Sequence, residues 1–137
     1  MSTAKVTYQS NLRTSCEHLK SSNTFITDAP TDNNGKGEAF SPTDTIAAGL
    51  ASCMLTVMGI KAATLEGAFI DGATALVTKT MASNPRRISK IEVVFNFPKK
   101  LEAKTQTILE NTANTCPVYY SLHPDIEKVI TYHWGDL

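Results

Sequence analysis

The chain has 137 residues, the usual size of one globular domain, and we predict a single domain over residues 1–137. Its 13 basic and 13 acidic side chains cancel to a formal net charge of zero. This balance argues against a nucleic-acid-binding protein, because such proteins normally carry a basic face. Hydrophobic residues make up 42% of the sequence, so a packed core is feasible.

The N-terminal part of the chain is predicted to form short strands. Val6 and Tyr8 alternate with polar residues, a second extended run covers residues 13–19, and a third covers residues 24–27 after a turn signal. Residues 28–38 are rich in aspartate, asparagine and glycine, which is typical of a loop.

A long helix is predicted to begin directly after this loop. Ser41 can cap the helix, Pro42 suits its first position, and the carboxylate of Asp44 lies in the first turn, where the helix dipole favours negative charge. The helix continues to about residue 62 and is apolar on nearly every side, so other structure must enclose it. A lone domain of this size rarely surrounds a helix fully, and we therefore predict an intertwined dimer.

The C-terminal half adds two strands, two helices and a last strand. Residues 74–81 are predicted as a strand, and the alternating apolar residues between Ile91 and Phe97 as a half-buried strand. Residues 101–113 carry a helical apolar stripe, a short helix begins at Cys116-Pro117, and residues 130–134 alternate as the final strand. This order of elements indicates an α+β fold.

The start of the chain and its cysteines indicate the compartment. Residues 1–9 lack the basic start and apolar run of a secretory signal. The longest weakly polar stretch, residues 44–61, is shorter than the roughly 20 residues that a helix needs to span a bilayer. The three cysteines are odd in number and form no dense framework. We predict a cytoplasmic protein without a membrane segment, in which any disulfide is transient and functional.

Two of the cysteines have different local settings. Cys53 lies in the middle of the apolar helix, where a free cysteine often only fills space. Cys116 precedes Pro117 and is therefore the predicted cap of a helix, where backbone N–H groups and the helix dipole should lower the pKa of its thiol. A cap with an ordinary thiol is the alternative, and the spacing alone does not show that the two cysteines meet.

Two motifs around these cysteines resemble those of one known family. The first is SPTDTIAAGLASC at residues 41–53, and the second is NTCPVYYSL at residues 114–122. Together with the order of elements, they resemble the osmotically inducible protein C and organic hydroperoxide resistance (OsmC/Ohr) family over essentially the whole chain. The resemblance implies an intertwined homodimer with long central helices wrapped by antiparallel β-sheets and two active sites at the subunit interface.

The resemblance also implies a chemistry. In this family the first motif cysteine attacks an organic hydroperoxide and the second resolves the sulfenic acid as a disulfide, so the roles fall on Cys53 and Cys116. The implied partners are the hydroperoxide substrate and a dithiol reductant, which is a lipoyl group in some members. The implied reaction needs no metal or bound cofactor.

The charged members of the implied site depart in part from the family pattern. Arg13 is the candidate cation beside the thiolate, with a solvated strand charge as the alternative. The hydroperoxide-resistance branch has a glutamate ten positions before the cysteine, where this chain has Thr43, and Asp44 stands nine positions before it. Nine steps of about 100° place Asp44 opposite Cys53 on a straight helix, so the acid that supports Arg13 is Asp44, Glu38 or neither. This departure indicates the general OsmC-like branch.

Other functions are weighed against the peroxidase. Cys16 and His18 share a strand, but neither a Cys-x-x-Cys nor a His-x-x-x-His spacing supports a metal site. The alternatives are a catalytically weak OsmC-like dimer that binds a ligand or serves a structural role, and a thiol-dependent transferase that uses the same cysteines.

Overall fold

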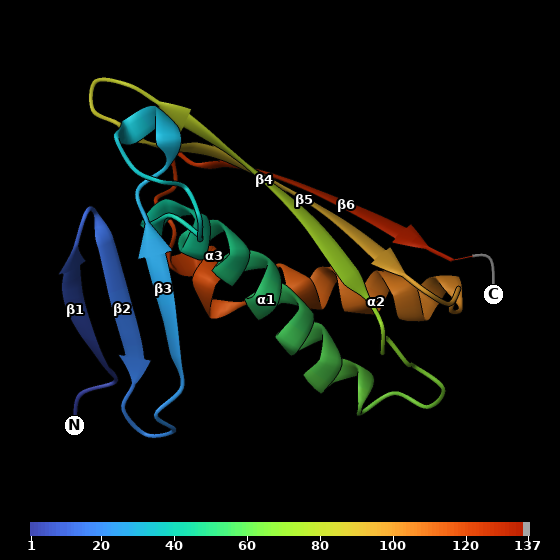
Figure 1. Cartoon of the computed structure of the whole chain (residues 1–137). Helices are drawn as coiled ribbons and strands as arrows, with labels where there is room; N and C mark the ends of the chain where they lie inside the picture. The colour runs from blue at the N-terminus through green and yellow to red at the C-terminus, as the bar shows by residue number, and fades with distance from the viewer. Residues whose placement is uncertain (136–137) are drawn as a thin grey trace. The chain divides into compact units, whose positions relative to one another are not determined.

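The structure, a computed structural model, describes residues 1–135 and contains two three-stranded sheets and three α-helices (Figure 1). The chain divides into two compact units, Met1–Ile46 and Ala47–Leu137, which we call the N-terminal and the C-terminal unit. The α+β fold predicted from the sequence is confirmed. The single-domain organisation stays a prediction.

The N-terminal unit is built on one antiparallel sheet in the order β1-β2-β3. Its strands are β1 (Ala4–Ser10), β2 (Arg13–His18) and β3 (Thr24–Asp28), and a single 3₁₀ turn, η1 (Thr31–Asn33), follows them. The three predicted strands are thus confirmed to within a residue or two. Side chains alternate between the faces of a strand, and the pairing of Arg13 with Asp28 therefore places these two on the same face.

The helix α1 (Pro42–Ala62) leads from the first unit into the second and matches the predicted limits. Ser41 and Asp44 hold its first turn by two reciprocal hydrogen bonds. The backbone N of Asp44 donates to Oγ of Ser41 at 3.1 Å, and the backbone N of Ser41 donates to Oδ2 of Asp44 at 2.9 Å. Length and composition alone would let α1 cross a membrane, but its buried residues pack in a protein core.

The C-terminal unit contains a mixed sheet in the order β4-β5-β6, with strands β4 (Thr74–Ala82), β5 (Arg87–Phe97) and β6 (Glu127–Trp134). β4 pairs with β5 antiparallel, whereas β6 pairs with β5 parallel. A parallel pair needs a crossover connection, which here contains α2 (Ala103–Ala113) and α3 (Pro117–Ser121). The sheet is therefore not antiparallel throughout.

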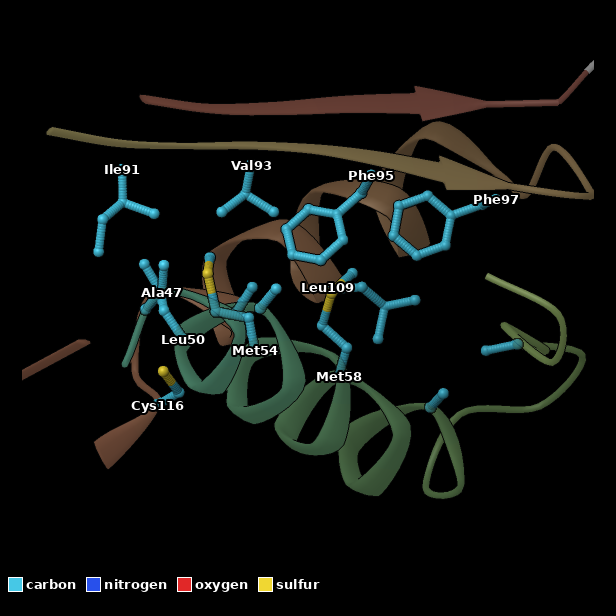
Figure 2. Packing of buried hydrophobic residues seen from close by; sticks show 14 residues of the cluster. Ala47, Leu50, Met54, Met58, Ile91, Val93, Phe95, Phe97, Leu109 and Cys116 are labelled. Atoms are coloured by element: carbon cyan, nitrogen blue, oxygen red, sulfur yellow. The ribbon is translucent and has the colours of Figure 1, made fainter. Parts of the chain in front are cut away.

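The core of the C-terminal unit lies between this sheet and the helices on one side of it (Figures 1 and 2). The alternation predicted between Ile91 and Phe97 is observed, since these residues and Val93 and Phe95 point from β5 toward the helices (Figure 2). These β5 residues form one core cluster with the following buried residues, most of which lie on α1 and α2: Ala47, Leu50, Ala51, Met54, Met58, Ala62, Ala68, Leu109, Ala113 and Cys116.

Candidate active site

The structure brings the two motif cysteines together within the C-terminal unit. Cys53, from the middle of α1, is partly buried and packs against the core, whereas Cys116, ahead of α3, is 0% exposed and belongs to the core. The two thiols lie close enough to interact, and Cys53 contributes to raising the pKa of Cys116. Figure 2 shows Cys116 beside the part of α1 that carries Ala47 and Leu50. Residues that lie 63 positions apart in the sequence are thus in contact.

Cys116 caps α3, as the Cys-Pro sequence predicts. Pro117 is the first residue of the helix, and the backbone N of Tyr119 donates a hydrogen bond to Sγ of Cys116 at 3.2 Å. The backbone N–H of Val118 also acts on this thiol and favours its charged form. The prediction of a helix-capping thiol is therefore confirmed.

The predicted lowering of the Cys116 pKa is wrong. Burial raises the pKa of this thiol, because the charged thiolate loses its hydration in the core. The N–H groups of Tyr119 and Val118 act in the opposite direction, and contact with Cys53 raises the pKa further. Cys116 caps α3 as the sequence predicts, but the burial of its thiol changes the pKa more than the N–H groups of the cap do.

The surroundings of Cys116 contain tyrosines and a lysine. The pKa of Tyr132 is raised to about 12, first by burial and then by the charges of Glu110, Tyr119 and Cys116. Nζ of Lys128 lies 5.1 Å from the centre of the Tyr119 ring and donates to the carbonyl of Ile126 at 3.1 Å. Lys128 carries no functional signal in the sequence, because its place over the Tyr119 ring depends on the fold of the chain between the two residues.

Three charged side chains of the N-terminal unit form a cluster, and they are Arg13, Asp28 and Glu38. Nε and Nη2 of Arg13 donate to the two carboxylate oxygens of Asp28 at 2.7 and 2.8 Å, and Nη2 also donates to Oε1 of Glu38 at 3.0 Å. The backbone N of Glu38 donates to Oδ2 of Asp28 at 3.1 Å. These bonds fix the plane of the guanidinium and leave Nη1 outside both ion pairs.

Asp28 is the site residue that the sequence analysis missed. Its side chain is buried, and the hydrogen bonds from Arg13 hold the pKa of its carboxyl below the usual value. Asp28 and Glu38 in turn raise the pKa of Arg13. An aspartate at the end of a strand is by itself a weak signal in a sequence. It becomes informative only when the strand register is known, because the register pairs Asp28 with Arg13.

The acidic candidates for supporting Arg13 now differ in their contacts. Glu38 is in direct contact with Arg13, whereas Asp44 bonds the backbone of Ser41 and stabilises the start of α1. The catalytic roles of Cys53, Cys116, Arg13 and Asp44 stay predictions. Within residues 1–135, no group of three or more His, Cys, Asp or Glu side chains is placed to hold a metal ion.

The arrangement supports one kind of chemistry above others. Two thiols in contact can be joined as a disulfide with small movements, provided that an oxidant first reacts with one of them. Of the pair, Cys53 is the residue with exposed surface, so an oxidant from solution has better access to it than to Cys116.

Comparison with known proteins places the chain in a family. The family model described as OsmC-like protein matches residues 35–130. A crystal structure from Psychrobacter arcticus 273-4 is 58% identical in sequence, with a TM-score of 0.94, and the match covers 97% of this chain and 96% of that one. That protein is described as an osmotic stress induced and detoxification response protein.

More distant structures share the fold. The organic hydroperoxide resistance protein OsmC of Legionella pneumophila is 16% identical, with a TM-score of 0.74 and coverage of 95% of this chain and 94% of that one. An organic hydroperoxide resistance protein of Elizabethkingia anophelis, with thiocyanate bound, is 18% identical, with a TM-score of 0.71 and coverage of 98% of both chains. The search of curated proteins finds no match.

Proposed function

The chain belongs to the family of OsmC-like proteins, and from this premise we propose that it is a thiol peroxidase that reduces organic hydroperoxides with Cys53 and Cys116. The observation that carries the proposal is the contact between these two thiols, of which one has exposed surface and the other is buried. Organic hydroperoxide resistance proteins among its structural neighbours agree with a hydroperoxide substrate.

The reaction proceeds in three balanced steps. The thiolate of Cys53 attacks the outer oxygen of the hydroperoxide, the O–O bond breaks, and the alcohol leaves with a proton, so that Cys53 becomes a sulfenic acid. The thiolate of Cys116 then attacks this sulfur and displaces hydroxide, which takes up a proton and leaves as water, and the disulfide forms. A dithiol, such as a dihydrolipoyl group, reduces the disulfide and is itself oxidised.

Arg13 is kept in the proposal as the cation that favours the reactive thiolate and orients the peroxide. Its guanidinium is fixed by Asp28 and Glu38, and a fixed donor stabilises developing charge better than a mobile one. Asp44 is kept as a predicted member of the site that acts at the start of α1.

We also propose that the protein is a homodimer. The following large apolar side chains are more than one third exposed in the single chain: Val6, Tyr8 and Phe25 of the N-terminal sheet, and Ile46 and Ile60 of α1. Exposed apolar surface of this kind is typical of a protein interface. The three free cysteines agree with a reducing compartment, and we propose a cytoplasmic location.

A peroxidase assay tests the proposal. We expect Cys53→Ser to abolish the dithiol-dependent consumption of cumene hydroperoxide, and Cys116→Ser to slow turnover and prevent the disulfide. Cys16→Ser is the matched control, because Cys16 lies on β2 at a position that pairs with Val6 and Phe25, and it should keep full activity. Undiminished consumption by the Cys53→Ser protein would remove the proposal.

One observation favours a second function, a catalytically weak dimer that binds a ligand or serves a structural role. Burial raises the pKa of Cys116, which reduces the thiolate available for resolution. Trapping the sulfenic acid with dimedone separates the two functions. A peroxidase shows a sulfenic acid at Cys53 that disappears as the disulfide forms, whereas the weak dimer shows neither species at modest peroxide concentrations.

A further inference from the structure

The two sulfurs of the thiol pair differ in access. Cys116 is 0% exposed and lies in the core with Leu109 and Ala113, which are also 0% exposed. Cys53 is only partly buried, at the surface of α1. In the disulfide, an incoming thiol would therefore reach the sulfur of Cys53 more easily than that of Cys116.

From this asymmetry we infer that the reductant attacks the sulfur of Cys53, and that Cys116 leaves as the thiolate into the N–H groups of Val118 and Tyr119. The inference rests on the disulfide of the proposed function and assigns the direction of its reduction. The first thiolate of the dithiol bonds to Sγ of Cys53, and the bond between Cys53 and Cys116 breaks with its electron pair on Cys116. The second thiol then attacks the reductant's own sulfur in this mixed disulfide and releases the thiolate of Cys53, and the reductant ends as a disulfide.

Geometry favours this direction. In thiol–disulfide exchange the rate depends on which sulfur is attacked and on the access to it. The incoming, central and leaving sulfurs lie near a line, so attack on Cys116 needs an approach from the side of that sulfur remote from Cys53. Cys116 has no exposed surface through which a thiolate can make this approach. Cys53 has exposed surface, and the proposed function already requires a hydroperoxide to reach it.

The cap of α3 receives the leaving group. Tyr119 donates its backbone N–H to Sγ of Cys116 at 3.2 Å, and the N–H of Val118 acts on the same sulfur. These donors oppose the effect of burial, which disfavours a thiolate at this position. A leaving thiolate at Cys116 therefore forms beside backbone N–H groups that favour its charge, whereas attack on Cys116 would place the leaving charge on Cys53, away from this cap.

A trapping experiment tests the direction of attack. The purified protein is oxidised with one equivalent of cumene hydroperoxide, then treated briefly with limiting 2-mercaptoethanol, quenched with acid and mapped by peptide mass spectrometry. We expect the mercaptoethanol adduct on Cys53 to exceed that on Cys116 by about tenfold or more, because access decides the rate. Adducts on Cys116 in equal or greater amount would overturn the inference.

Three controls accompany this test, and the first separates it from the proposed function. Oxidation with diamide forms the disulfide without a peroxidase step, so the direction is measured even where cumene hydroperoxide fails to react. The same treatment in guanidinium chloride should give nearly equal adducts, because unfolding removes the difference in access. The Cys16→Ser protein, treated in parallel, excludes exchange with the third thiol. Absence of a disulfide between Cys53 and Cys116 with either oxidant also overturns the inference.

Discussion

The two units of the chain are stabilised in different ways. In the part of the chain that the structure describes, all buried hydrophobic residues lie in the C-terminal unit, where they form the cluster between β5 and the helices (Figure 2). The buried residues of the N-terminal unit are polar, and they are Thr27, Asp28 and Ser41. One unit thus has an apolar core, and the other has a sheet that is held by hydrogen bonds and ion pairs.

This difference separates the two kinds of group that a thiol peroxidase needs. The sulfurs of Cys53 and Cys116 belong to the unit with the core, which can hold two thiols in a fixed contact. The guanidinium of Arg13 belongs to the unit without a core, where Asp28 and Glu38 fix it. A sheet without its own core gains stability when further structure covers its apolar side chains, which is the physical basis of the proposed dimer.

The largest expected effect comes from opening the apolar core. Phe95→Ala should lower the free energy of unfolding by about 3–5 kcal/mol, because the ring is fully buried and stacks with Tyr132. Phe69→Ala removes the same atoms from a side chain that is 65% exposed, and it should cost less than about 1 kcal/mol. Urea unfolding of both variants measures the comparison, and equal losses would mean that β5 does not carry the core.

The next effect comes from breaking the charge cluster. Asp28→Asn should destabilise the protein at neutral pH more than Glu38→Gln does, because Asp28 is buried and bidentate whereas Glu38 is largely exposed. Arg13→Met should reduce peroxide turnover on the order of a hundredfold. Activity and urea midpoints measure the two effects, and a Glu38→Gln loss that exceeds the Asp28→Asn loss would contradict this ranking.

The pH dependence follows from the sign of the Asp28 shift. The pKa of this carboxyl is lower in the native state than its usual value of 3.8, so the native state holds fewer protons than the unfolded state in this range. The stability that Asp28 contributes is complete above the usual pKa and is lost as the pH falls through it toward the lower native pKa. Asp28→Asn should therefore flatten the loss of stability below about pH 4. An unchanged acid profile would show that the pairing contributes nothing.

A smaller effect distinguishes the two roles of Cys116. In the reduced protein, Cys116→Ser should remain more stable than Cys116→Ala by about 1 kcal/mol, because serine can accept the N–H of Tyr119 and alanine cannot. Both variants lose the disulfide equally. Urea unfolding under reducing conditions compares them, and equal stability would show that the cap on α3 is energetically neutral.

The smallest effect concerns the pH dependence of disulfide formation. Because burial raises the pKa of Cys116 above the usual 9.0, the fraction of its thiolate still increases with pH above that value. The rate at which the Cys53 sulfenic acid converts to the disulfide should therefore continue to rise above pH 9.0. Stopped-flow measurements follow this step, and a rate that levels off near neutral pH would contradict the raised pKa.

Local signals in the sequence predicted the elements better than the site. The start of α1 follows from Ser41, Pro42 and Asp44, which act on their own helix turn, and the cap at Cys116 follows from its neighbour Pro117. The raised pKa of Cys116 could not be predicted, because it depends on burial by residues distant in the sequence.

The parts of the site that involve distant residues needed either the family resemblance or the structure. The contact between Cys53 and Cys116 followed only from the resemblance, since spacing gives no distance in space. Asp28 was missed because its pairing with Arg13 depends on the register between β2 and β3. The family resemblance identified the candidate reactive residues, whereas their surroundings depend on strand register and burial, which only the structure gives.

The most direct test of the account is the intact mass of the reduced protein after one equivalent of cumene hydroperoxide. We predict a loss of two hydrogen atoms, and peptide mapping should assign it to a disulfide between Cys53 and Cys116, with Cys16 still a free thiol. An unchanged mass, or a disulfide that includes Cys16, would contradict the central claim that the two sulfurs in contact are the redox centre.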